Sequence, residues 1–331
     1  MEYENKTLGD LLSDPRIRQI APDAIRNRDL RQENLWNMTL AQVKEAGFTG
    51  NIAAGLERLY AAADTGEWYY PLYTDEECAE DGFRKGVNVV WLPSDDPGAD
   101  QRPFILIVPG GGFVNVWSLT EGWPTAAQLN RLGYQVFVLT YQVGQTVSLL
   151  DKNMEVFSRA LRMIRKNEKK FRLCGDRYIT CGFSAGGYLV CLWNTPKGYA
   201  SFGLPKPKAS FPVYSPVSLK RRAYDPERAR RLYGDLADET ALRAYETQEY
   251  AEGFPPCALF LAADDELVSP DHSRMLAAAL EKFSVPCRLE IGPEGGHGFA
   301  DGSEMCMAGW PERAVRWFES IQESECHMAQ S

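Results

Sequence analysis

A strand-like run that breaks at a glycine-flanked serine is the feature of this sequence that most limits its possible folds. Residues 178–183 favour a β-strand, residues 182–186 read Gly-Phe-Ser-Ala-Gly, and a helical pattern follows. A turn this tight between strand and helix leaves no room for side chains two residues either side of the serine. The spacing therefore predicts a nucleophile elbow with Ser184 at its tip. The alternative is a glycine-rich turn that carries an ordinary surface serine.

A second glycine cluster follows the continuous apolar run at residues 104–108. That run is typical of a strand buried in a parallel sheet, and it ends in a proline and three glycines at 109–112. The cluster lacks the lysine of a P-loop and the spacing of a dinucleotide fingerprint, although a flexible loop stays an alternative. We expect the amides of Gly111, Gly112 and Ala185 to form an oxyanion hole for a tetrahedral intermediate.

The chain has only three histidines, which narrows the choice of a general base. His327 lies in a polar tail, and His272 lies where a helix is expected to begin, so neither has an evident catalytic position. His297 lies in a glycine-rich loop directly after the strand-like residues 287–291. It comes last in a Ser, Asp, His chain order, and we expect it to accept the proton of Ser184.

Three consecutive acidic residues follow the predicted strand at 257–263. They are Asp264, Asp265 and Glu266. An acid at the carboxyl end of this strand can orient the imidazole of His297 and stabilise its protonated form. Asp265 is the preferred candidate, since it fits the Asp-x-x-Val spacing common after this strand. Asp264 is the alternative, and Glu266 is expected to be a surface charge.

These four segments, in chain order, resemble the esterases of the α/β-hydrolase fold. The motifs are PGGGF at 109–113, GFSAGG at 182–187, DELV at 265–268 and GHGF at 296–299. The likeness is to the acetyl-esterase and feruloyl-esterase-like branch, which is related to the hormone-sensitive lipase group, and it covers about residues 85–320. The lipase group has His where this chain has Pro109 and an acid where it has Phe183. These departures favour the carbohydrate-esterase-like branch.

The resemblance implies a serine hydrolase that cleaves small acyl esters, acetyl-type esters of carbohydrates among them, through a Ser-His-Asp triad. It implies no cofactor and no metal, and a small-molecule ester as the partner. A peptidase or amidase, including an arylformamidase, would use the same triad and stays open, as does a non-catalytic binding protein on this scaffold. Phe113 and Trp117 are candidate substrate contacts, although Trp117 and Trp123 could equally belong to the core.

Alternating strand and helix patterns predict an α/β class with a mostly parallel, doubly wound sheet. Seven segments are predicted strands, at residues 87–92, 104–108, 135–141, 177–183, 209–214, 257–263 and 287–291. The candidate site residues then follow carboxyl ends of strands, where such folds bind ligands. Charged helical sequence at about 220–253 interrupts the alternation, and it predicts either a small helical cap or a solvated surface helix.

Residues 1–75 lie outside the minimal hydrolase pattern and are predicted to be a helical N-terminal extension, followed by the hydrolase domain at 76–331. Helical periodicity appears at 8–12, at 40–46 after the candidate cap Thr39, and at 52–63 after the candidate cap Asn51. We expect the extension either to fold over the active edge of the sheet or to mediate homo-oligomer formation. Its aromatic run at 68–73 is more typical of a packing anchor than of a substrate platform.

Composition argues against several partner classes. A net charge of −9 over 331 residues disfavours nucleic acid or an anionic membrane as the main partner. No stretch approaches the ~20 apolar residues of a membrane-spanning helix, and residues 1–5 lack the features of a signal peptide. We therefore expect a cytoplasmic protein. The eight cysteines include no Cys-x-x-Cys pair, which favours reduced thiols over a zinc site.

Overall fold

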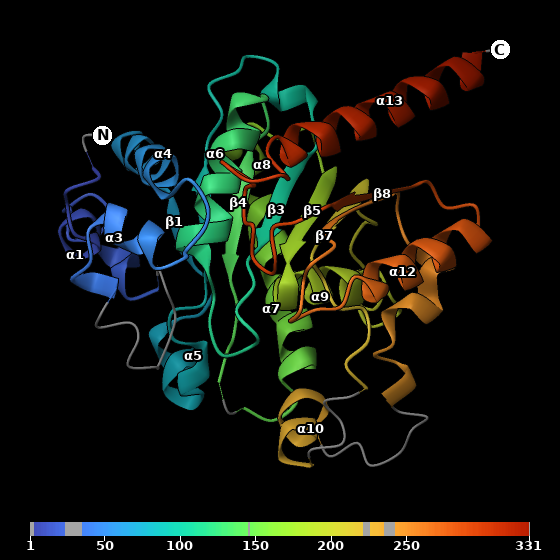
Figure 1. Ribbon diagram of the computed structural model, residues 1–331, viewed down its shortest axis with the longest axis horizontal. Coiled ribbons are helices and arrows are strands. Elements are labelled where there is room, and N and C mark those ends of the chain that lie inside the picture. Colours follow the sequence, from blue (N-terminus) through green and yellow to red (C-terminus); the bar gives the residue numbers. More distant parts are fainter. Residues whose placement is uncertain (1–2, 24–34, 145, 221–225, 235–241, 331) are drawn as a thin grey trace.

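The computed structural model describes residues 3–23, 35–144, 146–220, 226–234 and 242–330. Within these residues, an eight-stranded sheet runs through the centre of the molecule with helices on both faces (Figure 1). In spatial order its strands are β1 (Tyr69–Pro71), β2 (Asn88–Leu92), β4 (Val136–Thr140), β3 (Phe104–Val108), β5 (Tyr178–Phe183), β6 (Ala209–Val213), β7 (Cys257–Ala262) and β8 (Cys287–Gly292). From β4 to β8 all pairs are parallel, whereas β2 is antiparallel to both of its neighbours.

The predicted class, an α/β fold with a mostly parallel sheet, is confirmed, and all seven predicted strands are present. The sequence pattern did not predict β1. This strand is three residues long and pairs Tyr69 with Val90, so it is too short to show a period of its own. It brings the aromatic run at 68–73 to the edge of the sheet, where Trp68 and Tyr70 are buried.

Strand alternation divides the core between the two faces of the sheet. In β3, Ile105 and Ile107 pack on one face, whereas Phe104, Leu106 and Val108 pack on the other. The first face shares its core with α1 (Leu8–Leu12), α3 (Leu40–Glu45), α4 (Ile52–Asp64), α6 (Trp123–Arg131) and α13 (Trp310–Gln330). The second face is covered by α7 (Leu149–Lys166), α8 (Glu168–Phe171), α9 (Ser184–Trp193) and α12 (Asp271–Lys282). Among the described residues, no helix combines the length and the apolar character that crossing a membrane requires.

The N-terminal extension packs on the first face of the sheet. Its helices begin at the predicted caps, because the Thr39 side chain accepts a hydrogen bond from the amide of Gln42 and the Asn51 side chain accepts one from the amide of Ala54. The buried leucines of α4 belong to the same hydrophobic core as α6 and β3. The extension is therefore part of the packed body. A domain boundary at residue 75 and homo-oligomer formation stay predictions.

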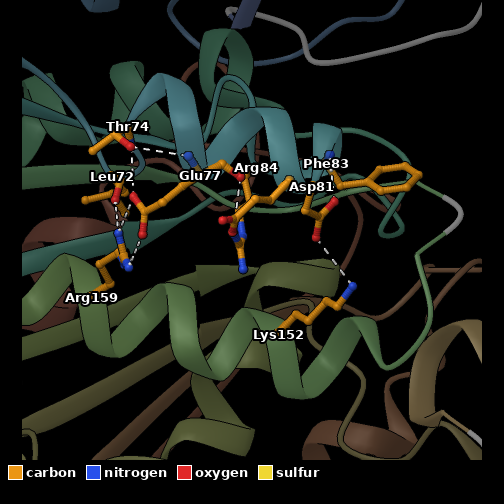
Figure 2. Close-up of polar contacts among 9 residues, drawn as sticks. Leu72, Thr74, Glu77, Asp81, Phe83, Arg84, Lys152 and Arg159 are labelled. Carbon is orange, nitrogen blue, oxygen red and sulfur yellow. Dashed lines mark hydrogen bonds and ion pairs between the residues drawn. The ribbon is translucent and has the colours of Figure 1, made fainter.

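Charged side chains join the segment after the extension to α7 (Figure 2). The helix α5 (Asp75–Glu80) lies along α7, and Arg159 donates to both carboxylate oxygens of Glu77, at 2.7 and 3.0 Å, and to the carbonyl of Leu72 at 2.8 Å. Asp81, four residues after Glu77, forms an ion pair with Lys152 of α7 at 3.5 Å. The two-pronged Arg159 contact fixes direction as well as distance, so it is the stronger of the two.

The predicted cap at about 220–253 is described only in part, since residues 221–225 and 235–241 lie outside the described residues. The described part contains α10 (Pro226–Tyr233) and the 3-10 helix η6 (Thr247–Gly253), and α10 lies beside the first turns of α7 (Figure 1). Between them, the Tyr245 hydroxyl donates to Asp151 of α7, and the Tyr188 hydroxyl of α9 donates to the Tyr245 carbonyl, each at 2.7 Å. The described part of this insertion is thus anchored on the second face.

Leu59→Ala should lower the free energy of unfolding by about 3 kcal/mol, because it leaves a cavity at a fully buried position of α4. If the extension shares the core of the sheet, the loss will appear in one cooperative transition of the whole protein, measured by urea unfolding with circular dichroism. Glu57→Ala, on the exposed side of the same helix, is the control and should change stability by less than about 0.5 kcal/mol. A separate early transition in the Leu59 variant would show an independently folding extension.

Candidate active site

Ser184 stands at the turn between β5 and α9, in the backbone conformation that the elbow pattern predicts. Its φ is +48°, a left-handed value that a non-glycine residue rarely adopts. A Cβ on Gly186 would lie 2.1 Å from the carbonyl oxygen of Val108 and 2.2 Å from that of Pro109. Glycine is therefore required at 186 because the first turn of α9 lies directly against the end of β3.

The structure brings His297 and Asp265 to Ser184. The His297 Nε2 atom lies 2.9 Å from the Ser184 Oγ, and its Nδ1 atom lies 2.8 Å from the Asp265 Oδ2. The other oxygen of Asp265 accepts hydrogen bonds from the amides of Leu267 and Val268, both at 2.9 Å. The Asp265 side chain is 1% exposed, so both of its oxygens are held by protein donors in a site with little water.

Asp264 has a different task from its neighbour. Its carboxylate is exposed and accepts hydrogen bonds from the amides of Gly296 at 2.8 Å and Gly295 at 3.2 Å. The amide of Gly296 in particular lowers the pKa of Asp264. Asp264 therefore fastens the loop that carries His297, and it is Asp265 whose side chain meets the imidazole.

Two other titratable candidates lie apart from this group. Glu266 is exposed, as expected for a surface charge. His272 is the second residue of α12, and its Nδ1 atom accepts a hydrogen bond from the amide of Val217 at 3.4 Å. His297, by contrast, meets the Ser184 hydroxyl directly.

The glycine loop after β3 turns through two residues with positive φ. Gly111 and Gly112 have φ values of +130° and +61°, and the carbonyl of Gly111 accepts hydrogen bonds from the amides of Val114 and Asn115. Within the described residues, the amides of Gly111, Gly112 and Ala185 donate to no protein acceptor. These amides belong to residues that line one cavity together with Ser184. The sequence-predicted oxyanion donors are thus brought together.

The cavity over Ser184 has a volume of about 310 Å³. Phe113 and Trp117 both line it, although Phe113 is 1% exposed and packs edge-on against Tyr188. Trp123, in contrast, is fully buried in the core. The remaining lining comes from Thr120 and Glu121, from loops after β6, β7 and β8, and from Gly47, Phe48 and Thr49 of the N-terminal extension. No described residue of α10 or η6 is among the lining residues, so in the described part of the chain the extension shapes this cavity and the predicted cap does not.

A buried carboxyl that the sequence analysis missed supports the glycine loop. Glu121 accepts a hydrogen bond from the amide of Gly110 at 2.5 Å and another from the hydroxyl of Tyr214 at 2.9 Å. The Tyr214 ring packs against the imidazole of His297, with centroids 4.9 Å apart. Burial raises the pKa of Glu121 to about 7, although both hydrogen bonds and a positive charge on His297 oppose that rise.

Glu121 gave no signal in the sequence because it lies in a segment of mixed polarity without helical or strand periodicity. The structure shows that residues 118–122 form a single π-helical turn, η4 (Ser118–Gly122), directly before α6. Such turns are rare and are common at functional sites. The extra residue in this turn places the Glu121 carboxyl in the interior, against the Gly110 amide and the Tyr214 hydroxyl. No periodic pattern would predict this placement.

Comparison with known proteins gives one family match and several curated relatives. The family described as BD-FAE matches residues 90–210, which include the glycine loop and Ser184 but neither Asp265 nor His297. Endo-1,4-beta-xylanase B of Butyrivibrio fibrisolvens is 28% identical over 236 residues, 66% of this chain and 35% of the relative. The acetylxylan esterase of Xylanibacter ruminicola is 26% identical over 240 residues, 68% of this chain and 45% of the relative. The chain thus spans less than half the length of either curated relative.

Solved structures agree in fold. The acetyl ester-xyloside bifunctional hydrolase of Caldicellulosiruptor lactoaceticus is 26% identical, with a TM-score of 0.63 over 77% of this chain and 96% of that one. A carboxylesterase of Lactobacillus plantarum is 23% identical, with a TM-score of 0.61 over 71% of this chain and 92% of that one. Both structures are matched almost completely, whereas about a quarter of this chain has no counterpart in either.

Compared with the wild type, the Glu121→Gln variant should become more stable as the pH rises. With a pKa of about 7 in the folded protein and 4.5 for an ordinary glutamate, Glu121 keeps its proton over a range where the unfolded chain loses it. The stability that this difference gives is fully present below about pH 4.5 and is lost as the pH approaches 7. Glutamine does not titrate, and its amide still offers an acceptor to Gly110 and a polar partner to Tyr214.

The free energy of unfolding of the variant, minus that of the wild type, should therefore increase by roughly 3 kcal/mol between pH 4.5 and 8. Urea unfolding at pH 4.5, 6 and 8 measures this difference. Glu57→Gln, at an exposed position of α4, serves as the control and should follow the wild type at every pH. A constant difference for Glu121→Gln would mean that the buried carboxyl does not titrate in this range.

Proposed function

We propose that this chain, an α/β hydrolase of the carbohydrate-esterase-like type, is a serine carboxylic-ester hydrolase that removes short acyl groups, acetyl in particular, from carbohydrate esters. The proposal rests on one observation above all, the continuous hydrogen-bonded line from Ser184 through His297 to Asp265, with contacts of 2.9 and 2.8 Å. The same three residue types, in the same chain order, perform acyl transfer in α/β hydrolases. The similarity to esterases of known structure supports ester chemistry.

In the first half of the reaction, the Ser184 Oγ attacks the ester carbonyl while His297 Nε2 takes its proton. The Asp265 carboxylate holds the imidazole through Nδ1 and stabilises the imidazolium that forms. The amides of Gly111, Gly112 and Ala185 donate to the carbonyl oxygen as it becomes negative. Each such donor lowers the barrier by about 3 kcal/mol in a preorganised site.

The first half ends when His297 gives this proton to the alcohol oxygen. The alcohol then leaves, and an acyl-enzyme remains on Ser184. In the second half, water gives a proton to His297 and attacks the acyl carbon. His297 then returns that proton to the Ser184 Oγ as its bond to the acyl carbon breaks, so that the acid and free Ser184 are released. Glu121 stands behind the glycine loop, where its bond to the Gly110 amide keeps the donors in place. None of these steps requires a metal or a cofactor.

The cavity supports a short acyl group. Its volume of about 310 Å³ is at the lower end of the usual range for small-molecule sites. Pro216, Leu219 and Val268 form an apolar wall at the ends of β6 and β7, which suits an acetyl methyl group. The names of two relatives, an acetylxylan esterase and an acetyl ester-xyloside hydrolase, favour a sugar as the alcohol.

Ser184→Ala should lower kcat/KM for p-nitrophenyl acetate by at least ~10³-fold and abolish labelling by a fluorophosphonate probe, because the attacking oxygen is gone. Ser201→Ala, at an exposed position, is the control and should keep both activities. The same assay with p-nitroacetanilide compares ester with amide cleavage. A wild-type protein that neither reacts with the probe nor turns over either substrate would contradict the proposal.

Asp265→Asn should lower kcat by about 10⁴-fold, because asparagine cannot stabilise the imidazolium and favours the wrong tautomer of His297. Asp264→Asn is the matched control, since the Asp264 carboxylate accepts hydrogen bonds from the amides of Gly295 and Gly296 whereas Asp265 meets the imidazole. It should lower kcat by less than tenfold. Steady-state kinetics with p-nitrophenyl acetate compares the two, and equal losses would mean that the acid has been assigned to the wrong residue.

A further inference from the structure

We propose that the N-terminal extension builds a subsite for the alcohol part of the substrate, a groove beside the catalytic cavity that binds the sugar residues of an acetylated oligosaccharide. The inference rests on the proposed esterase function and adds to it a substrate class and the residues that recognise it. The groove is lined by residues of the extension and of the loop after His297, and it has a volume of about 1100 Å³. We call it the lateral groove. Its lining includes Lys44, Phe48, Asn51, Ser303, Glu304 and Met305.

The lateral groove adjoins the catalytic cavity. Gly47, Phe48 and Thr49 line both of them, so these residues form the threshold between the two spaces. The Phe48 ring also packs against Trp117, with centroids 5.7 Å apart. A molecule that reaches from Ser184 into the groove must therefore pass the Phe48 side chain.

The way in which α3 ends determines the position of Phe48. Gly47 has a φ of +88°, its amide donates to the carbonyl of Lys44, and the amide of Phe48 donates to the carbonyl of Val43. These two bonds define a Schellman motif, in which the residue after the glycine is usually apolar. Phe48 is therefore held at a fixed point of the fold.

Three polar contacts fasten this segment to the loop that carries His297. The Thr49 hydroxyl donates to the carbonyl of Gly298, the residue directly after His297. The amide of Asn51 donates to the Asp301 carboxylate at 3.2 Å, and Lys44 forms an ion pair with Glu304 across the groove. The side of the site next to His297 is thus walled by the extension.

The mechanism places the alcohol on this side. His297 Nε2 must protonate the leaving oxygen, so the alcohol oxygen lies against the imidazole and the rest of the alcohol extends past its neighbours. Gly298 is one of these neighbours, and Thr49 and Phe48 lie behind it. The acyl group occupies the apolar wall of Pro216, Leu219 and Val268.

The chemistry of the lateral groove suits a polyhydroxylated chain. Lys44 and Glu304, although paired with each other, keep exposed donors and acceptors, Asn51 adds a side-chain amide, and Phe48 and Met305 offer apolar surface. Sugar hydroxyls need donors and acceptors side by side, and the C–H faces of a sugar ring pack on an aromatic ring. An acyl chain would instead remove water from these polar groups without replacing its hydrogen bonds.

The test compares substrates of increasing alcohol length, with ethyl acetate at one end and acetylated xylobiose and xylotetraose at the other. Acetate release should show a wild-type kcat/KM that rises with chain length. Phe48→Ala should reduce kcat/KM for acetylated xylotetraose at least tenfold more than for ethyl acetate, mainly through KM. Phe283→Ala is the matched control. Phe283 is an exposed phenylalanine at the end of α12 and does not line the lateral groove, so this variant should keep the wild-type profile.

Binding of unacetylated xylotetraose, measured by calorimetry, separates failure of the subsite from failure of the esterase function, because binding needs no turnover. The proposal predicts binding by the wild type and by Ser184→Ala, and at least tenfold weaker binding by Phe48→Ala and by Ala308→Trp, which fills the groove from its exposed rim. Equal losses for long and short alcohols, no rise with chain length, or a changed preference between acetate and butyrate would overturn it. If the wild type binds xylotetraose but hydrolyses no ester, the sugar-binding groove is supported and the proposed esterase function is refuted.

Discussion

The close approach of α9 to the end of β3 is the contact on which the whole site depends. A Cβ on Gly186 would meet the carbonyls of Val108 and Pro109 at little more than 2 Å, so two backbone segments touch without side chains between them. The pairing of β3 with β5, which places Val108 opposite Gly182, sets this distance. Ser184 and the glycine loop are consequently neighbours by sheet register. The positive end of α9 carries Ala185, whose amide is one of the proposed oxyanion donors.

Two buried carboxyls serve this site in opposite ways. Asp265 accepts two backbone amides and one imidazole, so its negative charge is matched by three donors. Glu121 accepts one amide and one hydroxyl, and burial favours its neutral form. The difference follows from their surroundings, because charge is tolerated in a dry site only where enough donors surround it. One carboxyl is therefore held beside His297 by three donors, while the other anchors the glycine loop and has a pKa that burial raises to about 7.

The sequence predicted the parts of the molecule that local patterns encode. Continuous apolar runs identified the parallel strands, because a strand buried on both faces has no polar side, and the scarcity of histidine left a single loop candidate, His297. Glu121 and β1 escaped because a π-helical turn and a three-residue strand have no period. The threshold at Phe48 also escaped, since it arises from contacts between residues about 250 positions apart, such as Thr49 with Gly298. Long-range packing of this kind is invisible in any local window.

The extension links stability to specificity. Its helices share one core with β3 and α6, so the wall that it presents to the cavity is anchored in the same packed core as the sheet. A wall of this kind binds without the entropic cost of ordering a loop, which favours a site that is already shaped for its ligand. It also restricts change, because a substitution that opens the lateral groove near Phe48 acts close to the buried residues of α3 and α4. Variation in alcohol preference should therefore be easier at the exposed rim, at Lys44 and Glu304, than at the threshold itself, since the rim can exchange polar groups without disturbing the core.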